Sequence, residues 1–348
     1  MSRYAPLLIV FLALAACAAN PWLDGSAPHR TPPGFKNVYP HPEKGGFWQW
    51  KLEQWRAGKP VKPEGGYRFE TAQPETPFLR SNRRETTATW IGHATVLLQT
   101  AGVNILTDPQ FSERASPVGF AGPKRVVPAT SALADLPYID AVLISHDHYD
   151  HLDVASITAL ARQPGGSPRF FVRLGTKAWF AALGITNVVE LDWWQNIEFM
   201  GIDVNFVPVQ HWSKRTLTDE NQRLWGGWVV RHPGFSFYFT GDAGYSMDFA
   251  DVGRRFGGFD LAAIPIGAYE PRWFMKTMHV NPEESVRIHR DVKSQVSLGI
   301  HWGTFEDLTD ESLYEPPRVL AAEAAKAGLA PGEFFVLKHG ETRRFAPR

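Results

Sequence analysis

The segment SHDHYDHLD at residues 145–153 concentrates histidine and aspartate side chains directly after a short apolar run. His146 and His148 are two residues apart, so a loop that leaves a strand can turn both imidazoles toward one point. Asp150 and His151 would then project toward a second point nearby. Imidazole nitrogen and carboxylate oxygen are ligands for borderline cations such as zinc. The spacing suggests two adjacent metal positions, and the alternative is a solvated polar loop.

Three later residues stand in a similar place, each at the carboxyl end of an apolar run: His211, Asp242 and His301. Taken singly, each histidine could be a buried core residue, and Asp242 could start a turn after Gly241. Their shared position favours one site, because loops at one edge of a sheet are where such sites are assembled. The hypothesis is a dinuclear centre, with His146, His148 and His211 on one metal, Asp150, His151 and His301 on the other, and Asp242 bridging.

Short apolar runs predict the strands that would position these residues, and they begin near residue 86. The predicted strands are 87–91, 96–99, 104–107, 141–144, 203–209, 236–240, 261–264 and 295–300. Helices are predicted at 152–161, 177–183 and 319–327, with a further helix start at Asn281-Pro282-Glu283-Glu284. Strands with interspersed helices predict an α/β layered architecture over residues 86–348. Residues 17–85 are rich in Pro and Gly and are interpreted as an arm without an independent domain.

The composition limits the kinds of partner. The chain has 348 residues, 44% hydrophobic and 21% charged, which suits a globular protein with a substantial core. Lys plus Arg and Asp plus Glu both number 36, so no global field attracts nucleic acid, and we expect no nucleic-acid partner. Any anionic substrate must be held by local charge.

The amino-terminal end predicts export. Residues 1–16 combine a single basic residue, Arg3, with a short apolar run, as in a signal peptide. The run ends in Leu-Ala-Ala-Cys, which resembles the lipobox of bacterial lipoproteins, and an ordinary cleavage site is the alternative. Acylation of Cys17 would anchor the chain in the cell envelope, and Ala18 favours the outer membrane, facing the periplasm. Cys17 is the only cysteine, so metal ligands must be His, Asp or Glu.

The H-x-H-x-D-H motif and its later partners resemble the pattern of the metallo-β-lactamase superfamily. Residues 88–345 are most similar to the family of phospholipases D that hydrolyse N-acyl-phosphatidylethanolamine, in stretches such as TWIGHATVLLQ, DAVLISHDHYDHLD, QHWSKRTLTDE, FTGDAGY and IHWGTF. The resemblance implies a four-layer αβ/βα sandwich with two zinc ions per chain. It implies release of an N-acylethanolamine from the phospholipid, leaving phosphatidic acid, and a homodimer.

The resemblance also implies roles for single residues. Asp242 would bridge the metals as a catalytic ligand. His279, from the stretch MKTMHVNPEE, would donate a proton to the leaving group, or would simply be a loop histidine close to the helix start. His93 and Asp108 would orient ligands or merely form turns. Tyr149 would contact a lipid headgroup or merely pack.

Lys214, Arg215 and Arg272 could meet phosphate, although solvation is the more common fate of loop cations. No role is assigned to a further set of histidines, namely His29, His41, His232, His289 and His339.

Two departures from the family pattern bear on the substrate. Asp147 and Met278 replace the asparagine and glutamine of animal members, and Asp147 is expected to add negative charge beside the metals. Two other functions therefore stay open. One is hydrolysis of a soluble phosphodiester or lactone at the same metals, and the other is a non-enzymatic metal-binding envelope lipoprotein.

Overall fold

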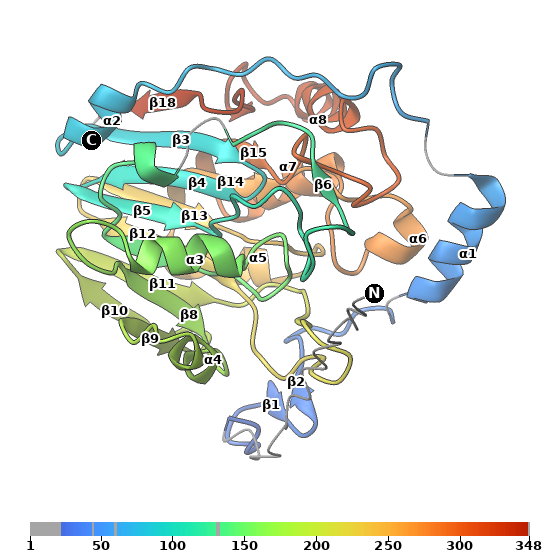
Figure 1. Cartoon of the computed structure of the whole chain (residues 1–348), viewed down its shortest axis with the longest axis horizontal. Helices are drawn as coiled ribbons and strands as arrows, with labels where there is room; N and C mark the ends of the chain where they lie inside the picture. The colour runs from blue at the N-terminus through green and yellow to red at the C-terminus, as the bar shows by residue number, and fades with distance from the viewer. Residues whose placement is uncertain (1–21, 44, 59–60, 130–132, 347–348) are drawn as a thin grey trace, which may run out of the picture.

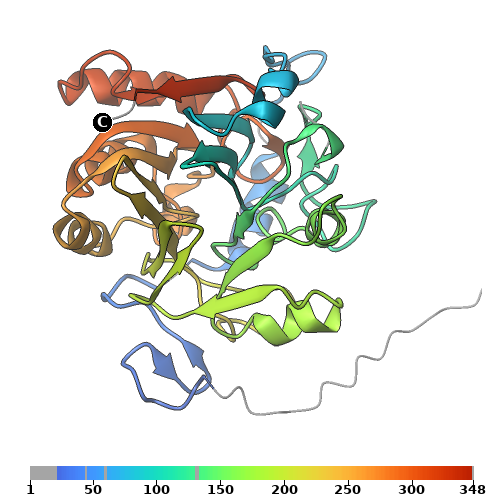
Figure 2. The same ribbon diagram turned by 90° about the vertical axis from the view of Figure 1, so that its left-hand side faces the viewer.

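Two facing β-sheets form the centre of the molecule, with helices on both outer faces (Figures 1 and 2). The computed structural model describes residues 22–43, 45–58, 61–129 and 133–346. The expected signal peptide and Cys17 lie outside the described residues.

The first sheet has seven strands. Their order is β18 (Thr342–Phe345), β3 (Thr86–Gly92), β4 (Thr95–Thr100), β5 (Val103–Thr107), β7 (Ala141–Leu143), β8 (Arg169–Arg173) and β9 (Val188–Leu191). The strands β18 to β5 pair antiparallel, and β5 to β9 pair parallel. Parallel strands point their carboxyl ends to one edge, which is where the loop after β7 begins.

The second sheet also has seven strands. Their order is β10 (Asn196–Phe199), β11 (Ile202–Val207), β12 (Gly227–His232), β13 (Phe235–Phe239), β14 (Phe259–Pro265), β15 (Ser294–Ile300) and β17 (Phe334–Phe335). The strands β13, β14 and β15 are parallel to one another. Two small ladders pair β1 (Arg30–Thr31) with β2 (Gly34–Phe35) and β6 (Lys124–Arg125) with β16 (Phe305–Glu306).

The helices form the two outer layers. One flank carries α3 (Val154–Ala161) and α4 (Lys177–Ala182), and the other carries α5 (Asp248–Phe256), α7 (Pro282–Asp291) and α8 (Glu315–Lys326), as Figure 2 shows. Shorter elements are α2 (Thr76–Ser81), α6 (Arg272–Met275) and a 3₁₀ turn at Leu133–Asp135. The predicted four-layer sandwich is therefore confirmed.

Apolar side chains fill the space between the layers. Trp90 and Phe171 of the first sheet share one buried cluster with Phe206, Trp228 and Phe239 of the second. A separate cluster packs the outer face of the first sheet against α3 and α4. Burial of such large apolar surfaces supplies the main stabilisation, at roughly 25 cal/mol per Å². The sheets therefore form a rigid base for the loops at their edge.

The helix start predicted at Asn281 is confirmed. The Asn281 side chain accepts a hydrogen bond from the Glu284 amide, and Glu284 accepts one from the Asn281 amide, which together make a capping box. The strands β8 and β9 and the helix α5 were not predicted, although α5 has a clear amphipathic pattern, and the helix α1 (Phe47–Ala57) lies within the predicted arm.

The arm crosses the molecule and packs on it. Trp50 of α1 stacks on Phe274 of α6, with ring centroids 5.0 Å apart. The Trp50 indole N–H donates to Asp310 Oδ2 at 2.8 Å. Among the described residues, no helix is long and apolar enough to cross a bilayer.

Candidate metal centre

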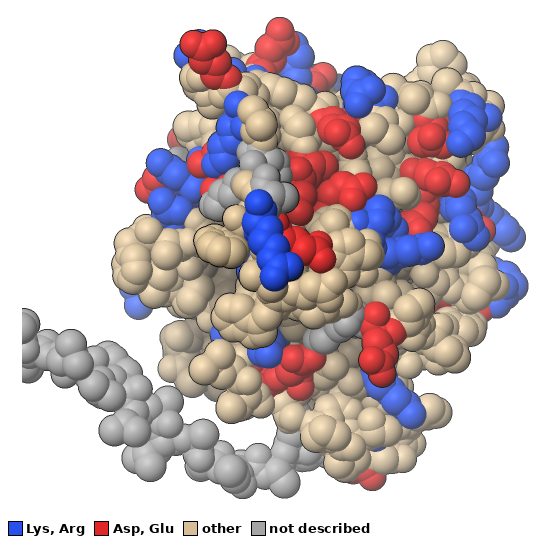
Figure 3. Space-filling view, turned by 90° about the vertical axis from the view of Figure 1, so that its right-hand side faces the viewer, with Lys and Arg blue, Asp and Glu red and all other residues tan. Residues whose placement is uncertain are grey.

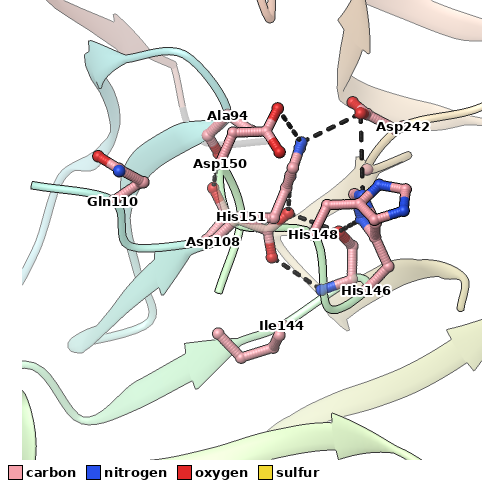
Figure 4. Close-up of polar contacts among 12 residues, drawn as sticks. Ala94, Asp108, Gln110, Ile144, His146, His148, Asp150, His151 and Asp242 are labelled. Atoms are coloured by element: carbon pink, nitrogen blue, oxygen red, sulfur yellow. Dashed lines mark hydrogen bonds and ion pairs between the residues drawn. The ribbon is translucent and has the colours of Figure 1, made fainter. Parts of the chain in front are cut away.

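The loops that follow four strands bring the predicted ligands to one edge of the sandwich. The strand β7 leads into His146, His148, Asp150 and His151, whereas β11, β13 and β15 lead into His211, Asp242 and His301. Figure 4 shows five of these side chains, from His146 to Asp242, turned toward one another. All of the predicted ligands are thus brought into one cluster.

Three imidazoles make up the first group of the cluster. His146 Nε2 lies 2.9 Å from His148 Nδ1, and His211 Nε2 lies 3.4 Å from the same atom. The three ring nitrogens could therefore hold one cation. His211 Nδ1 is 2.9 Å from the carbonyl oxygen of Met278, so its N–H donates there and leaves the Nε2 lone pair free to face the group.

The second group contains carboxylates as well as imidazoles. His151 Nε2 and His301 Nε2 are 3.1 Å apart, and Asp150 Oδ2 lies 3.5 Å and 3.4 Å from them. Asp242 Oδ2 is 3.1 Å from His151 Nε2 and 3.9 Å from His146 Nε2, so it reaches both groups. This is the position that a bridging carboxylate requires.

The donor set fits cations. Neighbouring ligand atoms on a tetrahedral zinc with 2.0–2.1 Å bonds are about 3.3 Å apart, which is the range found here. Asp242 is 2% exposed, and its Oδ1 lies 3.1 Å from His301 Nε2. A buried carboxylate is costly unless positive charge compensates it, and a bound cation would supply that charge. Histidines and aspartates without thiolates are also a donor set found at catalytic zinc sites.

The two groups of ligands differ in their electrostatic environment. Burial holds the pKa of the His146 and His211 imidazoles well below the ordinary value, so both rings are neutral and can donate a lone pair. Burial also opposes the charged form of His151, but Asp242 and Asp150 outweigh it and raise the His151 pKa well above the ordinary value. The second group is therefore the more negative environment and would attract cations more strongly.

Asp108 and Ser145 form hydrogen bonds that hold the ligands in place. Asp108 Oδ2 lies 2.7 Å from His151 Nδ1, and both Asp108 oxygens accept hydrogen bonds from Ser145. The Ser145 hydroxyl is in turn 2.9 Å from His146 Nδ1. His93 Nε2 lies 3.0 Å from Asp150 Oδ2. These contacts orient the ligands as outer partners do in zinc sites, and Ser145 is the one of these residues that was not predicted from the sequence.

Unusual backbone conformations concentrate at the centre. His93, Asp108 and His301 have φ values of 53°, 30° and 62°, in the left-handed region that costs energy for residues other than glycine. Gly241 precedes Asp242 with φ 64°, and a Cβ there would lie 2.5 Å from the Ser145 Cβ. The turn that presents Asp242 therefore requires glycine.

His279 faces the same cluster from the loop before α7. Its Nδ1 is 3.8 Å from Asp242 Oδ2 and has no hydrogen-bond partner among the described residues. Burial lowers its pKa to about 4, although Asp242 opposes the shift. Arg272 donates to the His279 carbonyl oxygen at 2.9 Å and to Glu284 at 2.7 Å. Arg272 therefore fixes this loop, and the expectation that it is merely solvated is wrong.

The negative charge expected from Asp147 does act beside the ligands: burial lowers the pKa of His148, and Asp147 opposes that shift. The Asp147 carboxylate is fully buried and turned toward two guanidiniums, 3.1 Å from Arg223 and 3.9 Å from Arg173. It also accepts a hydrogen bond from the Lys214 amide at 2.9 Å. Its negative charge is therefore compensated, and Asp147 joins the motif to the loop that follows His211.

Tyr149 and the cations near it are tied to the protein. The Tyr149 hydroxyl donates to the Arg215 carbonyl oxygen at 2.8 Å, and the Arg215 guanidinium lies 4.1 Å from the Tyr149 ring centroid. Arg215 also donates to the carbonyl oxygens of Asp147 and Leu152. Lys214 pairs with Glu220 at 3.0 Å. Solvation is therefore the wrong description of Arg215, which braces the loop that carries the motif.

The remaining histidines lie outside the cluster and bond to other groups. His29 lies 2.8 Å from Asp192, His41 is 2.9 Å from Asn37, His232 is 2.8 Å from Thr100, His289 is 2.8 Å from Ser297, and His339 is 3.1 Å from Thr304.

A pocket of about 370 Å³ opens beside the cluster. His148, Asp150, Asp242 and His279 line one end, and Tyr149 also reaches the wall. The remaining wall is largely apolar and includes Phe47, Trp50, Phe274, Met275 and Met278. Two of these residues come from α1. The aromatic residues of the stretch GFWQW are expected from the sequence to line a site or a membrane-facing surface, and Phe47 and Trp50 line this pocket.

Comparison with known proteins identifies the class. A family model described as "Beta-lactamase superfamily domain" matches residues 103–302. The structure of Igni18, a metallo hydrolase from Ignicoccus hospitalis, matches 76% of this chain and 99% of its own with a TM-score of 0.58 and 20% identity. An isothiocyanate hydrolase from Delia radicum gut bacteria gives the same TM-score and identity over 75% of this chain and 99% of its own. The chain has the fold of these hydrolases.

The sequence relatives are more specific. N-acyl-phosphatidylethanolamine-hydrolyzing phospholipase D 1 of Caenorhabditis elegans is 46% identical over 239 residues, 66% of this chain and 67% of that protein. The corresponding Saccharomyces cerevisiae enzyme is 36% identical over 69% of this chain and 52% of its own length. An uncharacterised Mycobacterium tuberculosis protein is 42% identical over 73% and 70%. The chain therefore belongs to the N-acyl-phosphatidylethanolamine-hydrolysing phospholipase D family of the beta-lactamase superfamily, and it is a metal-dependent hydrolase.

Proposed function

We propose that this hydrolase cleaves N-acyl-phosphatidylethanolamine, or a closely related phospholipid, into an N-acylethanolamine and phosphatidic acid. The observation that carries the proposal is the direct opening of the histidine and aspartate cluster into an apolar pocket. A phosphodiester could lie at the cluster while the acyl chains occupy the apolar wall. The 46% identity to the Caenorhabditis elegans enzyme supports the same substrate class.

The proposal includes two zinc ions. His146, His148 and His211 would hold one, Asp150, His151 and His301 would hold the other, and Asp242 would contact both. When bound, such a pair supplies an activated water and neutralises charge on phosphate oxygens. The absence of thiolates and the charge-compensated ligands agree with a catalytic pair.

The remaining chemistry falls to this chain's own side chains. His279 lies at the pocket end of the cluster, and its buried Nδ1 faces Asp242 without a hydrogen-bond partner among the described residues. We propose that His279, whose pKa of about 4 leaves the ring neutral, takes up the proton that the attacking water releases and gives it to the leaving ethanolamine oxygen, which is a poor leaving group when it carries the negative charge. Met278, Phe274 and Trp50 would exclude bulk water from the same end.

Location and assembly complete the proposal. Acylation of Cys17 would anchor the chain in the bacterial envelope, on the outer membrane and facing the periplasm. Enzyme and lipid would then be confined to one surface, which raises their encounter frequency without tighter binding. The homodimer expected from the family resemblance is part of the same proposal.

A lipid panel tests the function. The purified protein is incubated with micelles of N-acyl-phosphatidylethanolamine, phosphatidylcholine, a soluble phosphodiester or a lactone, and products are identified by mass spectrometry. We expect metal-dependent formation of phosphatidic acid and N-acylethanolamine from the first lipid. Turnover of only the soluble substrates would favour the alternative hydrolase, and metal binding without any turnover would favour a non-enzymatic lipoprotein.

A further inference from the structure

Asn37, in the amino-terminal arm, bonds to the backbone of the proposed ligand His211. Asn37 Oδ1 accepts from the His211 amide at 3.0 Å, and Asn37 Nδ2 donates to the His211 carbonyl oxygen at 3.0 Å. We propose that Asn37 is a positioning residue, which keeps His211 Nε2 in the first group of ligands, so that the arm completes the metal centre. The proposal rests on the two zinc ions of the proposed function, and its test measures zinc binding rather than turnover.

All four hydrogen-bonding positions of the Asn37 amide are in use. Besides the two bonds to His211, Oδ1 accepts from the Trp225 indole N–H at 3.0 Å, and Nδ2 lies 2.9 Å from His41 Nε2. His41 Nδ1 is 2.8 Å from the Pro42 carbonyl oxygen, so Nδ1 carries the proton and Nε2 accepts. Two donor and two acceptor positions are what an amide provides, so neither a carboxylate nor an apolar side chain could make all four contacts.

The backbone of His211 needs such a partner. His211 is 2% exposed and lies beyond the end of β11 at Val207, outside the regular ladder between β11 and β12. A pocket of about 450 Å³, lined by Asn37, His211 and Met278 among other residues, lies on the same side. Hydrogen bonds rather than close packing therefore hold the His211 backbone there. A buried backbone amide or carbonyl that loses its partner is costly, so the segment would shift without Asn37.

Asn37 and Met278 support different parts of His211. The Met278 carbonyl oxygen accepts from Nδ1 and fixes the rotation of the ring, whereas Asn37 fixes the backbone from which the ring projects. Together they keep Nε2 3.4 Å from His148 Nδ1. Distances between a metal and its ligands hold within about 0.2 Å, so even a small shift of the backbone would weaken the site.

The arm is held against the loop between β11 and β12, so Asn37 is itself fixed. Phe35 donates its amide to the Asn221 carbonyl oxygen at 2.8 Å, and a Cβ at Gly34 would lie 2.6 Å from the same oxygen. Figure 1 shows β1 and β2 beside this loop. Figure 3 faces the side that carries α1 of the arm, where charged groups of both signs border a broad uncharged area. The arm therefore acts on the centre through contact and not through a field of one sign.

A double-mutant cycle of zinc affinity tests the proposal. Wild type, Asn37→Ala, His211→Ala and the double variant are made in the full chain and stripped of metal with a chelator. Zinc affinity is measured by competition with a metal indicator, and circular dichroism checks folding. The control is Tyr39→Phe, which removes a bond from the same arm to Asp251 but leaves His211 untouched. If Asn37→Ala does not fold, Asn37→Ser takes its place with the same expected results.

We expect Asn37→Ala to weaken one of the two zinc sites about tenfold, as for outer partners of zinc ligands, while Tyr39→Phe binds zinc like wild type. In the His211→Ala background the change at Asn37 should have no further effect, because it acts through a ligand that is already lost. Unchanged affinity in Asn37→Ala, an equal loss in Tyr39→Phe, or the same loss in both backgrounds would overturn the proposal. Wild type is assayed separately on N-acyl-phosphatidylethanolamine, and failure there rejects the proposed function but not the role of Asn37.

Discussion

His146 of the metal centre and His339 outside it are equally buried, yet their ring nitrogens face different groups. His146 and His339 are each 1% exposed. His146 Nε2 points to another ring nitrogen and to a carboxylate, 2.9 Å from His148 Nδ1 and 3.9 Å from Asp242 Oδ2. His339 instead packs against Trp90 at 4.3 Å between centroids and bonds to Thr304. Convergence of donor atoms, and not burial, therefore marks a ligand.

The largest effect is expected at Asp242, because its carboxylate reaches both groups of ligands. The change Asp242→Asn should lower hydrolysis by more than about a hundredfold, beyond the loss typical of outer partners. The amount of bound metal per chain, measured by elemental mass spectrometry, should fall together with the rate of hydrolysis. The matched control is Asp248→Asn, a buried acid that bonds to Ser246 outside the cluster. Equal loss of metal in both variants would contradict the claim that Asp242 binds metal because it lies among other ligand atoms, whereas Asp248 is merely buried.

Replacing Asp147 should lower the stability of the fold and leave metal binding unchanged. Asp147→Asn leaves the buried Arg173 and the partly buried Arg223 without their shared counter-charge, so the free energy of unfolding should fall by about 3 kcal/mol in urea titrations. Metal per folded chain and the preferred lipid should stay as in wild type. A switch of substrate would contradict the compensated charge described above. Asp219→Asn, which removes only the more exposed partner of Arg223, should cost less.

Asp108 provides a finer test inside the centre. Asp108→Asn weakens the hydrogen bond that orients His151 but removes no proposed ligand. Metal affinity of the second group should fall about 10- to 100-fold, as for outer partners of zinc ligands. Competition with a metal indicator would resolve a weakened site beside an unchanged one. Equal weakening of both sites would mean that the two groups do not act separately.

The ionisation of His339 should change the stability of the protein only at acid pH. Burial lowers its pKa from 6.5 to about 3, so the unfolded chain binds the extra proton between these values. Its contribution to stability is therefore complete above pH 6.5 and is lost as the pH falls, by at most about 1.4 kcal/mol per pH unit. Denaturant titrations at several pH values should show a smaller acid-side slope for His339→Gln than for wild type. Identical slopes would argue against a buried neutral imidazole.

The sequence predicted the parts of the molecule whose signals are local. Strand-like runs followed by His146, Asp242 or His301 suggested a common edge, and the capping box at Asn281 could be derived from residue types. The pairing that compensates the negative charge of Asp147 could not be predicted, because Arg173 and Arg223 come from distant segments. The aromatic stretch GFWQW suggested a lining for a site, but the packing of α1 into the pocket wall could not be predicted, since Trp50 gains its role only by packing on Phe274.

A stepwise zinc titration of chelator-treated protein, with release of phosphatidic acid from N-acyl-phosphatidylethanolamine as the readout, tests the central claim most directly. The two groups of ligands predict that activity rises until two zinc ions are bound per chain and then levels off. Absence of phosphatidic acid at every zinc level, or full activity with a single ion, would contradict the proposed dinuclear phospholipase.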